Sequence, residues 1–126
     1  LVSYDKLEIT KLDIRAQVKN LHVDIAVNFG LLVAELITNS IKHGFQPEHE
    51  DFTIEMRIKE NKDLISFAYT DNGKGMGDSD HIETGNSFGM KMIRSIIKKM
   101  NGEIVFPTEL KSGFNLFFDF KLKADE

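Results

Sequence analysis

The stretch from Val27 to Lys42 constrains the fold most, because it has the periodicity of a helix with one apolar side. At about 100° per residue, one broad arc of the helical wheel collects the apolar residues Phe29, Leu32, Val33, Ala34, Leu36, Ile37 and Ile41. The opposite side collects Asn28, Glu35, Asn39, Lys42 and His43. Gly44 and Pro47 predict that the helix ends there. Such a helix must bury its apolar side against a second layer.

The remaining patterns predict a sheet as that layer. Residues 52–58 alternate between apolar and polar, and residues 64–69 resume the alternation after a hairpin-type connection at 60–63. Residues 7–18 alternate loosely, as one or two short strands do, and residues 22–26 read as extended, with Asp24 or Asn28 as the helix cap. A second amphipathic helix is predicted over 88–100, ended by Asn101-Gly102, with strands over 103–106 and 114–120. We therefore expect an α+β two-layer sandwich: a mixed, mainly antiparallel sheet with helices on one face.

Composition narrows the class of protein. The 126 residues fit one domain, 1–126, and the net charge of −4 with no basic run longer than Lys98-Lys99 argues against a nucleic-acid partner. The absence of cysteine excludes disulfides and thiolate metal sites. The longest apolar run, Phe29 to Ile37, is interrupted by Glu35, so we expect no membrane span of about 18 residues. Because the chain begins at Leu1 without an initiator methionine, we interpret it as a fragment of a longer protein.

Glu35 and Asn39 are the first candidate site. They lie four residues apart, on the polar side of an otherwise apolar helix, and Lys42 and His43 follow on the same side. Carboxylate and amide oxygens suit Mg²⁺, an ion that usually shares its shell with water and substrate phosphates. Lys42 would add a point charge toward the same phosphates. Alone, this stripe is more typical of a solvated helix face than of a site.

Two glycine-bearing segments are the other candidates. Asp-Asn-Gly-Lys-Gly-Met at 71–76 follows a strand, and its glycines allow close approach of the backbone to a ligand. Gly-Asn-Ser-Phe-Gly-Met at 85–90 leads into a helix, whose first N–H groups can bind phosphate oxygens. Neither is a P-loop or a Rossmann fingerprint. Alone, each also fits an ordinary surface turn or a capped helix start.

The order of these motifs closely resembles the Bergerat-fold (GHKL) ATPases, the superfamily of gyrase, heat-shock chaperone, histidine kinase and mismatch-repair ATPases. Residues 35–43 look like its N-box, 71–76 like its first glycine box, 87–90 like its second, and Ser112-Gly113-Phe114 like a late glycine element. The N-box is most similar to that of sensor histidine kinases with a short ATP lid. The resemblance covers roughly residues 20–120.

The resemblance implies a role for each matching position. Asn39 would ligate Mg²⁺ through the ATP phosphates, and Glu35 would act catalytically, orienting a water or the nucleophile and reaching the metal through water. Asp71 would accept a hydrogen bond from the amino group of adenine. The implied ATP-binding set is Asn39, Lys42, His43, Asp71, Gly73, Gly75, Met76, Ser87, Phe88, Gly89 and Met90. Residues 77–88 would form the lid, hinged at Gly89, and Ile37, Met76 and Phe88 would line the apolar pocket. Asn86 and Ser87 stand where many relatives carry glycine.

As a whole, the resemblance implies the catalytic ATP-binding domain of a bacterial sensor histidine kinase. Such a domain donates the γ-phosphoryl group of ATP to a histidine on a separate dimerisation domain, and a response regulator acts downstream. We expect a cytoplasmic location, no direct membrane contact by this chain, and a parent that can be membrane-anchored. His22, His49 and His81 read as surface residues, so the phosphoacceptor would lie elsewhere. The alternatives are a serine protein kinase of the anti-sigma-factor type and a nucleotide-binding regulatory module without kinase activity.

Overall fold

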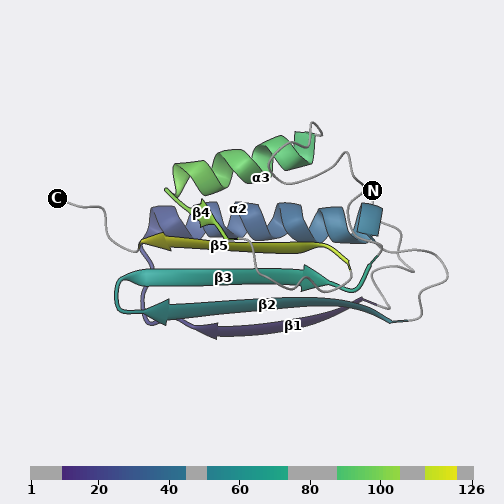
Figure 1. The fold of residues 1–126 in the computed structure, drawn as a ribbon, viewed down its shortest axis with the longest axis horizontal. Coiled ribbons are helices and arrows are strands. Elements are labelled where there is room, and N and C mark those ends of the chain that lie inside the picture. The colour runs from purple at the N-terminus through teal and green to yellow at the C-terminus, as the bar shows by residue number, and fades with distance from the viewer. Residues whose placement is uncertain (1–9, 45–50, 74–87, 106–112, 122–126) are drawn as a thin grey trace.

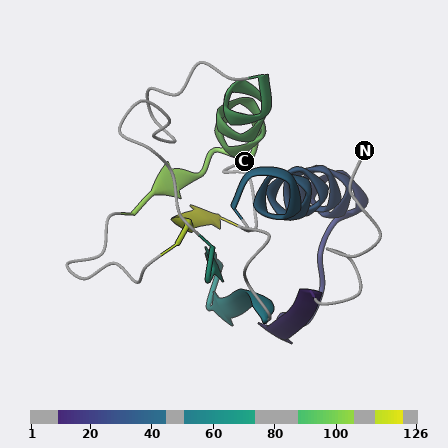
Figure 2. The same ribbon diagram turned by 90° about the vertical axis from the view of Figure 1, so that its right-hand side faces the viewer.

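A five-stranded sheet carries two helices on one face (Figures 1 and 2). The computed structural model describes residues 10–44, 51–73, 88–105 and 113–121. The strands lie in the order β1 (Thr10–Gln17), β2 (Phe52–Asn61), β3 (Leu64–Asp71), β5 (Asn115–Lys121) and β4 (Glu103–Ile104). Strand β1 pairs parallel with β2, and the other neighbours pair antiparallel. The predicted α+β two-layer sandwich, with a mixed and mainly antiparallel sheet, is confirmed.

The first helix, α2 (Val23–Asn39), begins four residues earlier than the sequence indicated. The extended segment predicted over 22–26 is therefore wrong. Val23 and Ile25 mimic the alternation of a strand, but Ile25 packs against the hydrophobic core as part of the first helical turns. His22 enters the helix in an extended conformation and makes no side-chain capping bond, so neither Asp24 nor Asn28 is the cap.

Helix α2 continues into one π-helical segment, Ser40–Gly44, and ends at the predicted glycine. Such segments occur often at functional sites. The segment buries Ser40, Ile41 and Gly44 and leaves Lys42 and His43 exposed. Ala34, which was expected on the apolar side of α2, is exposed instead. The π-helical segment thus separates a buried polar group from two exposed basic side chains within a few residues.

Together the two segments, Val23–Gly44, are long and apolar enough to cross a membrane by length and composition alone. The sequence expectation missed this because it considered only the apolar run from Phe29 to Ile37, which Glu35 interrupts. In the fold, however, α2 lies along the sheet with Phe29, Leu32 and Leu36 buried. Val23, Val27 and Leu31 on the same helix are exposed.

The hydrophobic core fills the space between the sheet and the helices. The residues that β2, β3 and β5 turn toward the helices are buried, and they are Phe52, Ile54, Met56, Ile65, Phe67, Tyr69, Leu116, Phe118 and Phe120. The ring of Phe29 on α2 meets Phe67 edge-on at 5.2 Å between centroids. Because side chains two apart on a strand share a face, Asp71 follows Tyr69 on this same inward side. The core therefore ends in a carboxylate.

The connections show how the second helix and the last strands are placed. Lys62, with φ of 62°, turns the hairpin between β2 and β3. Helix α3 (Phe88–Lys99) ends at Asn101, whose φ is 57°, and Gly102 N donates to Ile97 O at 2.9 Å. This is the Schellman ending that Asn101-Gly102 predicted. Strand β4 is shorter than predicted, although Val105 N still donates to Phe117 O at 2.8 Å.

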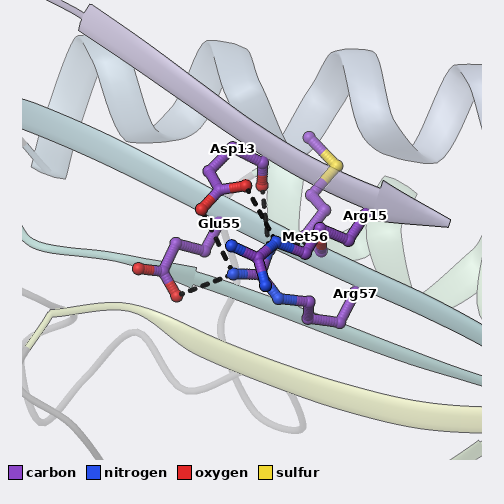
Figure 3. Close-up of polar contacts among 5 residues, drawn as sticks. All are labelled: Asp13, Arg15, Glu55, Met56 and Arg57. Atoms are coloured by element: carbon purple, nitrogen blue, oxygen red, sulfur yellow. Dashed lines mark hydrogen bonds and ion pairs between the residues drawn. The ribbon is translucent and has the colours of Figure 1, made fainter.

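A cluster of charged side chains joins edge strand β1 to β2 on the face of the sheet away from the helices (Figure 3). The Arg57 guanidinium lies 3.2 Å from an Asp13 carboxylate oxygen and 3.8 Å from Glu55, and it also donates to the Asp13 carbonyl. Arg15 meets Asp13 at 3.6 Å. These side chains are more than a third exposed, so each pair contributes little to stability.

Candidate functional site

Asp71 is the charged residue buried most deeply in the described part of the chain, at 4% exposure. Its Oδ1 accepts the backbone N–H of Gly73 at 2.9 Å and of Phe114 at 3.0 Å. Its Oδ2 accepts the hydroxyl of Ser40 at 2.6 Å. A buried carboxylate needs such donors to offset its desolvation. These bonds hold the Asp71 side chain in one orientation, at the junction of β3, β5 and the π-helical segment.

Gly113 and Gly73 allow these three segments to meet. Gly113 has φ of +93°, and a Cβ there would lie 2.1 Å from the carbonyl oxygen of Asp71. A Cβ on Gly73 would lie 2.3 Å from the carbonyl oxygen of Gly44. Neither approach is open to a residue with a side chain. The late glycine element and the first glycine box therefore both pack around one aspartate.

Asn72 fixes the start of the loop that follows β3. Its backbone N–H donates to Thr53 O at 3.1 Å, and its side-chain oxygen accepts the Thr53 N–H at 2.8 Å. Its side-chain nitrogen donates to Asp51 O at 2.9 Å. On the other side, Asp71 N donates to Phe114 O at 3.0 Å. The segment is thus attached to both neighbouring strands, a role for Asn72 that sequence reasoning missed.

Glu35, Asn39 and Gly89 form a second cluster. The two side chains are half-buried on α2, and Gly89 lies in the first turn of α3. A Cβ on Gly89 would lie 2.7 Å from Glu35 Oε1 and about as close to the Asn39 amide, at 3.0 and 3.1 Å. Asn39 Nδ2 is buried and has no hydrogen-bond partner among the described residues. The fold therefore brings the N-box and the second glycine box together, with one polar atom left for a ligand.

Tyr69 and Ser40 connect the two clusters, and sequence reasoning assigned neither. Tyr69 is fully buried, donates to Leu36 O at 2.9 Å, and lies 2.6 Å from Ser40 Oγ. Burial raises the pKa of the Tyr69 phenol well above its ordinary value, so the hydroxyl stays neutral. Ser40 directly follows Asn39 and contacts Asp71. The sequence shows only that a tyrosine two residues before the aspartate shares its face of the strand, and not where the hydroxyl points.

The other predicted positions are placed in part. Ile37 is half-buried and packs against the core, and the side chain of Met90 belongs to the core, so a nucleotide contact by Met90 would use its backbone. Lys42 and His43 are exposed at the end of the α2 segment. Phe88 begins α3, without a described side chain. The remaining predicted positions lie outside the described residues: Gly75, Met76, Ser87 and the rest of the lid.

Comparison with known proteins places this geometry in a family. Residues 24–126 match the family described as histidine kinase-, DNA gyrase B-, and HSP90-like ATPase. The chain is 27% identical over 105 residues to the signal transduction histidine-protein kinase/phosphatase DegS of Brevibacillus brevis, covering 83% of this chain and 25% of that protein. It is 23% identical over 74 residues to the sensor histidine kinase PdtaS of Mycobacterium tuberculosis, covering 59% of this chain and 15% of that protein.

Solved structures share the fold. The histidine kinase domain of the blue-light activated histidine kinase from Erythrobacter litoralis superposes with a TM-score of 0.75 at 23% identity, covering 90% of this chain and 55% of that one. The chain thus spans about half of that structure and a quarter or less of the curated relatives. The family match covers most of the chain, and it includes both clusters described above. The chain belongs to the family of histidine kinase-, DNA gyrase B- and HSP90-like ATPases.

Proposed function

We propose that this chain is the ATP- and Mg²⁺-binding catalytic domain of a bacterial sensor histidine kinase. In this proposal it donates the γ-phosphoryl group of ATP to a histidine on a separate dimerisation domain. One observation carries it: a buried aspartate acceptor and a Glu35/Asn39 pair are joined through consecutive residues of one helix, with Gly89 packed against the pair. The similar proteins are histidine kinases by name, which supports this member of the family over the others.

Asp71 supports recognition of adenine. An ionised carboxylate has about four lone-pair positions and no proton to donate. Three donors from the protein occupy this one: two backbone N–H groups and the Ser40 hydroxyl. The position that remains suits a donor such as the exocyclic amine of adenine. A base that presents a carbonyl there would place its oxygen against the carboxylate oxygen of Asp71, and no hydrogen bond could form.

Asn39 and Glu35 support binding of the Mg²⁺–phosphate group. Amide and carboxylate oxygens are hard ligands that fit Mg²⁺, and the unsatisfied Asn39 Nδ2 can donate to a phosphate oxygen. When bound, Mg²⁺ neutralises charge on the phosphates. The exposed Lys42 adds positive charge at this end, and His43 beside it is exposed as well.

In the proposed reaction an imidazole nitrogen forms a bond to the γ-phosphorus. The bond from that phosphorus to the bridging oxygen of ADP breaks, and ADP leaves. Catalysis of this kind is mostly positioning and charge stabilisation. Glu35 orients the incoming imidazole by accepting its other N–H. A response regulator would then take the phosphoryl group, and a location in the cytoplasm, where ATP is available, is part of the proposal.

Phosphate transfer to the parent's own dimerisation domain tests the proposal. The chain is mixed with that domain and with ATP labelled at the γ position, and the modified residue is identified by its acid lability and by mass spectrometry. We expect phosphohistidine on the added domain, lost in Asn39→Ala and retained in Ser66→Ala, which removes an exposed hydroxyl from β3. Acid-stable phosphoserine on a protein substrate would favour the serine kinase instead. ATP binding without any transfer would favour the regulatory module.

A further inference from the structure

Ser40 has one hydroxyl proton and more than one acceptor for it. Its Oγ lies 2.6 Å from both Asp71 Oδ2 and the hydroxyl oxygen of Tyr69. A serine in a helix can also donate to the carbonyl four residues earlier, which for Ser40 is that of Leu36. Which acceptor receives the proton decides what the buried end of the site presents to a base.

The hydroxyl of Tyr69 removes one of these acceptors. It donates to Leu36 O at 2.9 Å, and so occupies the carbonyl that competes for the Ser40 proton. Two hydroxyl protons must serve three contacts: Ser40 to Asp71, Tyr69 to Leu36, and the contact between the two hydroxyls. If Ser40 donates to Asp71, the Tyr69 proton must lie between Leu36 O and Ser40 Oγ. Otherwise two lone pairs would face each other at 2.6 Å.

We propose that Tyr69 is a positioning residue for base recognition, which directs the Ser40 proton onto Asp71 and so makes the site select a base that carries an amine over one that carries a carbonyl. The inference rests on the proposed function and adds a specificity determinant to it. The hydrogen-bonded route from Tyr69 to the Asp71 carboxylate runs through Ser40, because Tyr69 hydrogen-bonds to Ser40 and Leu36 and Ser40 bonds to Asp71. With its proton on Asp71, Ser40 has no proton for a ligand carbonyl.

Removing the Tyr69 hydroxyl frees the Ser40 rotor. In Tyr69→Phe the ring remains in the core, where it lies edge-on to Phe114 with centroids 6.0 Å apart. Ser40 can then donate to Leu36 O or to a ligand, and Asp71 loses a fixed donor. ATP binding weakens because Asp71 is less well oriented, while a base with a carbonyl gains a donor. The preference for ATP therefore falls.

Calorimetric titration of the chain with ATP and with inosine triphosphate, both with Mg²⁺, measures this preference. Inosine triphosphate carries a carbonyl in place of the adenine amine. The preference is the Kd for inosine triphosphate divided by the Kd for ATP. Since one hydrogen bond contributes roughly 1 kcal/mol, we expect Tyr69→Phe to lower this ratio about three- to tenfold. We expect a loss of similar size in Ser40→Ala, and no change in Ser66→Ala, which removes a hydroxyl from the outer face of the same strand.

A double-mutant cycle tests the route through Ser40. If Tyr69 acts through Ser40, Tyr69→Phe leaves the ratio unchanged in the Ser40→Ala background. If Tyr69→Phe weakens binding of ATP and of inosine triphosphate equally, Tyr69 has a structural role and the proposal is overturned. The proposal is also overturned if Tyr69→Phe changes the ratio as much in the Ser40→Ala background as in the wild type. Should Tyr69→Phe unfold, a Ser40→Ala chain with the wild-type ratio would overturn it as well. Failure of the unmodified chain to bind ATP would instead refute the proposed function.

Discussion

Replacement of Gly89 by alanine should change phosphoryl transfer without changing the stability of the fold. The added Cβ would lie 2.7 Å from Glu35 Oε1 and 3.0 Å from Asn39 Nδ2. To reach ordinary contact at 3.4 Å, the Glu35 carboxylate must move by about 0.7 Å. That carboxylate is the far end of a flexible side chain, so the helices need not separate. Alanine also has the higher helix propensity, by up to about 1 kcal/mol.

The expected result is a chain of near-normal stability with a damaged site. We expect the free energy of unfolding of Gly89→Ala to stay within about 1 kcal/mol of the wild-type value, because propensity and crowding oppose each other. We expect phosphoryl transfer to fall tenfold to a hundredfold, since displacement by roughly 1 Å lowers rates by about that amount. Denaturant unfolding and labelled transfer to the parent's dimerisation domain measure the two quantities.

Gly30→Ala is the matched control. Gly30 also lies in a helix, but a Cβ there would meet nothing within 4 Å. This variant should gain up to about 1 kcal/mol of stability and transfer phosphate at the wild-type rate. Equal transfer rates for Gly89→Ala and Gly30→Ala would refute the reasoning, because the approach of α3 to Glu35 and Asn39 would then not matter. Unfolding of Gly89→Ala would refute it too, since the contact would then be part of the fold.

Four further substitutions have expected outcomes. Asn39→Ala should abolish the Mg²⁺ dependence of ATP affinity in calorimetry with little effect on unfolding, because its Nδ2 has no partner among the described residues; a persistent metal effect would point to other ligands. Asp71→Asn should weaken ATP binding and lower the free energy of unfolding, each by about 1–3 kcal/mol, because an amide cannot accept at both positions; unchanged calorimetric affinity would contradict the assignment to adenine. Gly113→Ala, at φ of +93° and 2.1 Å from a backbone oxygen, should lose at least about 1–3 kcal/mol of stability in denaturant unfolding; wild-type stability would show that the turn can relax. Since burial raises the Tyr69 pKa, the native state keeps a proton that the unfolded state releases above about pH 10; stability should therefore fall with rising pH there, and less steeply in Tyr69→Phe, whereas equal slopes would mean that Tyr69 is not the titrating group.

The sequence predicted the layers of the fold because they depend on periodicity, which side chains report directly. The alternation in 52–58 and 64–69 gave β2 and β3, and the helical spacing gave most of α2 and α3. The start of α2 failed because Val23 and Ile25 carry a strand-like local preference that packing of Ile25 on the core overrides. The length of strand β4 was overestimated, because only Glu103 and Ile104 of the described residues form its ladder with β5.

For the candidate site, the motifs indicated which polar residues to watch but not how they are held. The pairing of Asp71 with Ser40 joins residues 31 positions apart, and that of Asp71 with Phe114 joins residues 43 apart. No local pattern reports such contacts. Tyr69 was hidden because a tyrosine at an inward strand position looks like any other core residue, and only the fold shows where its hydroxyl points. The approach of Gly89 to Glu35 required the relative placement of two helices.

The attachment of Asp71 and Asn72 to the strands on both sides determines which parts of the fold hold the two ends of the candidate site. Their amides pair with Phe114 and Thr53, so Asp71, the proposed base contact, belongs to the middle strand of the sheet and is held from both sides. The other end is a contact between side chains of α2 and the first turn of α3, and it involves no strand of the sheet. A nucleotide bound across both would contact the sheet at one end and the two helices at the other. Under the proposed function, the contacts to the base and the contacts to the phosphates would therefore belong to different layers of the fold.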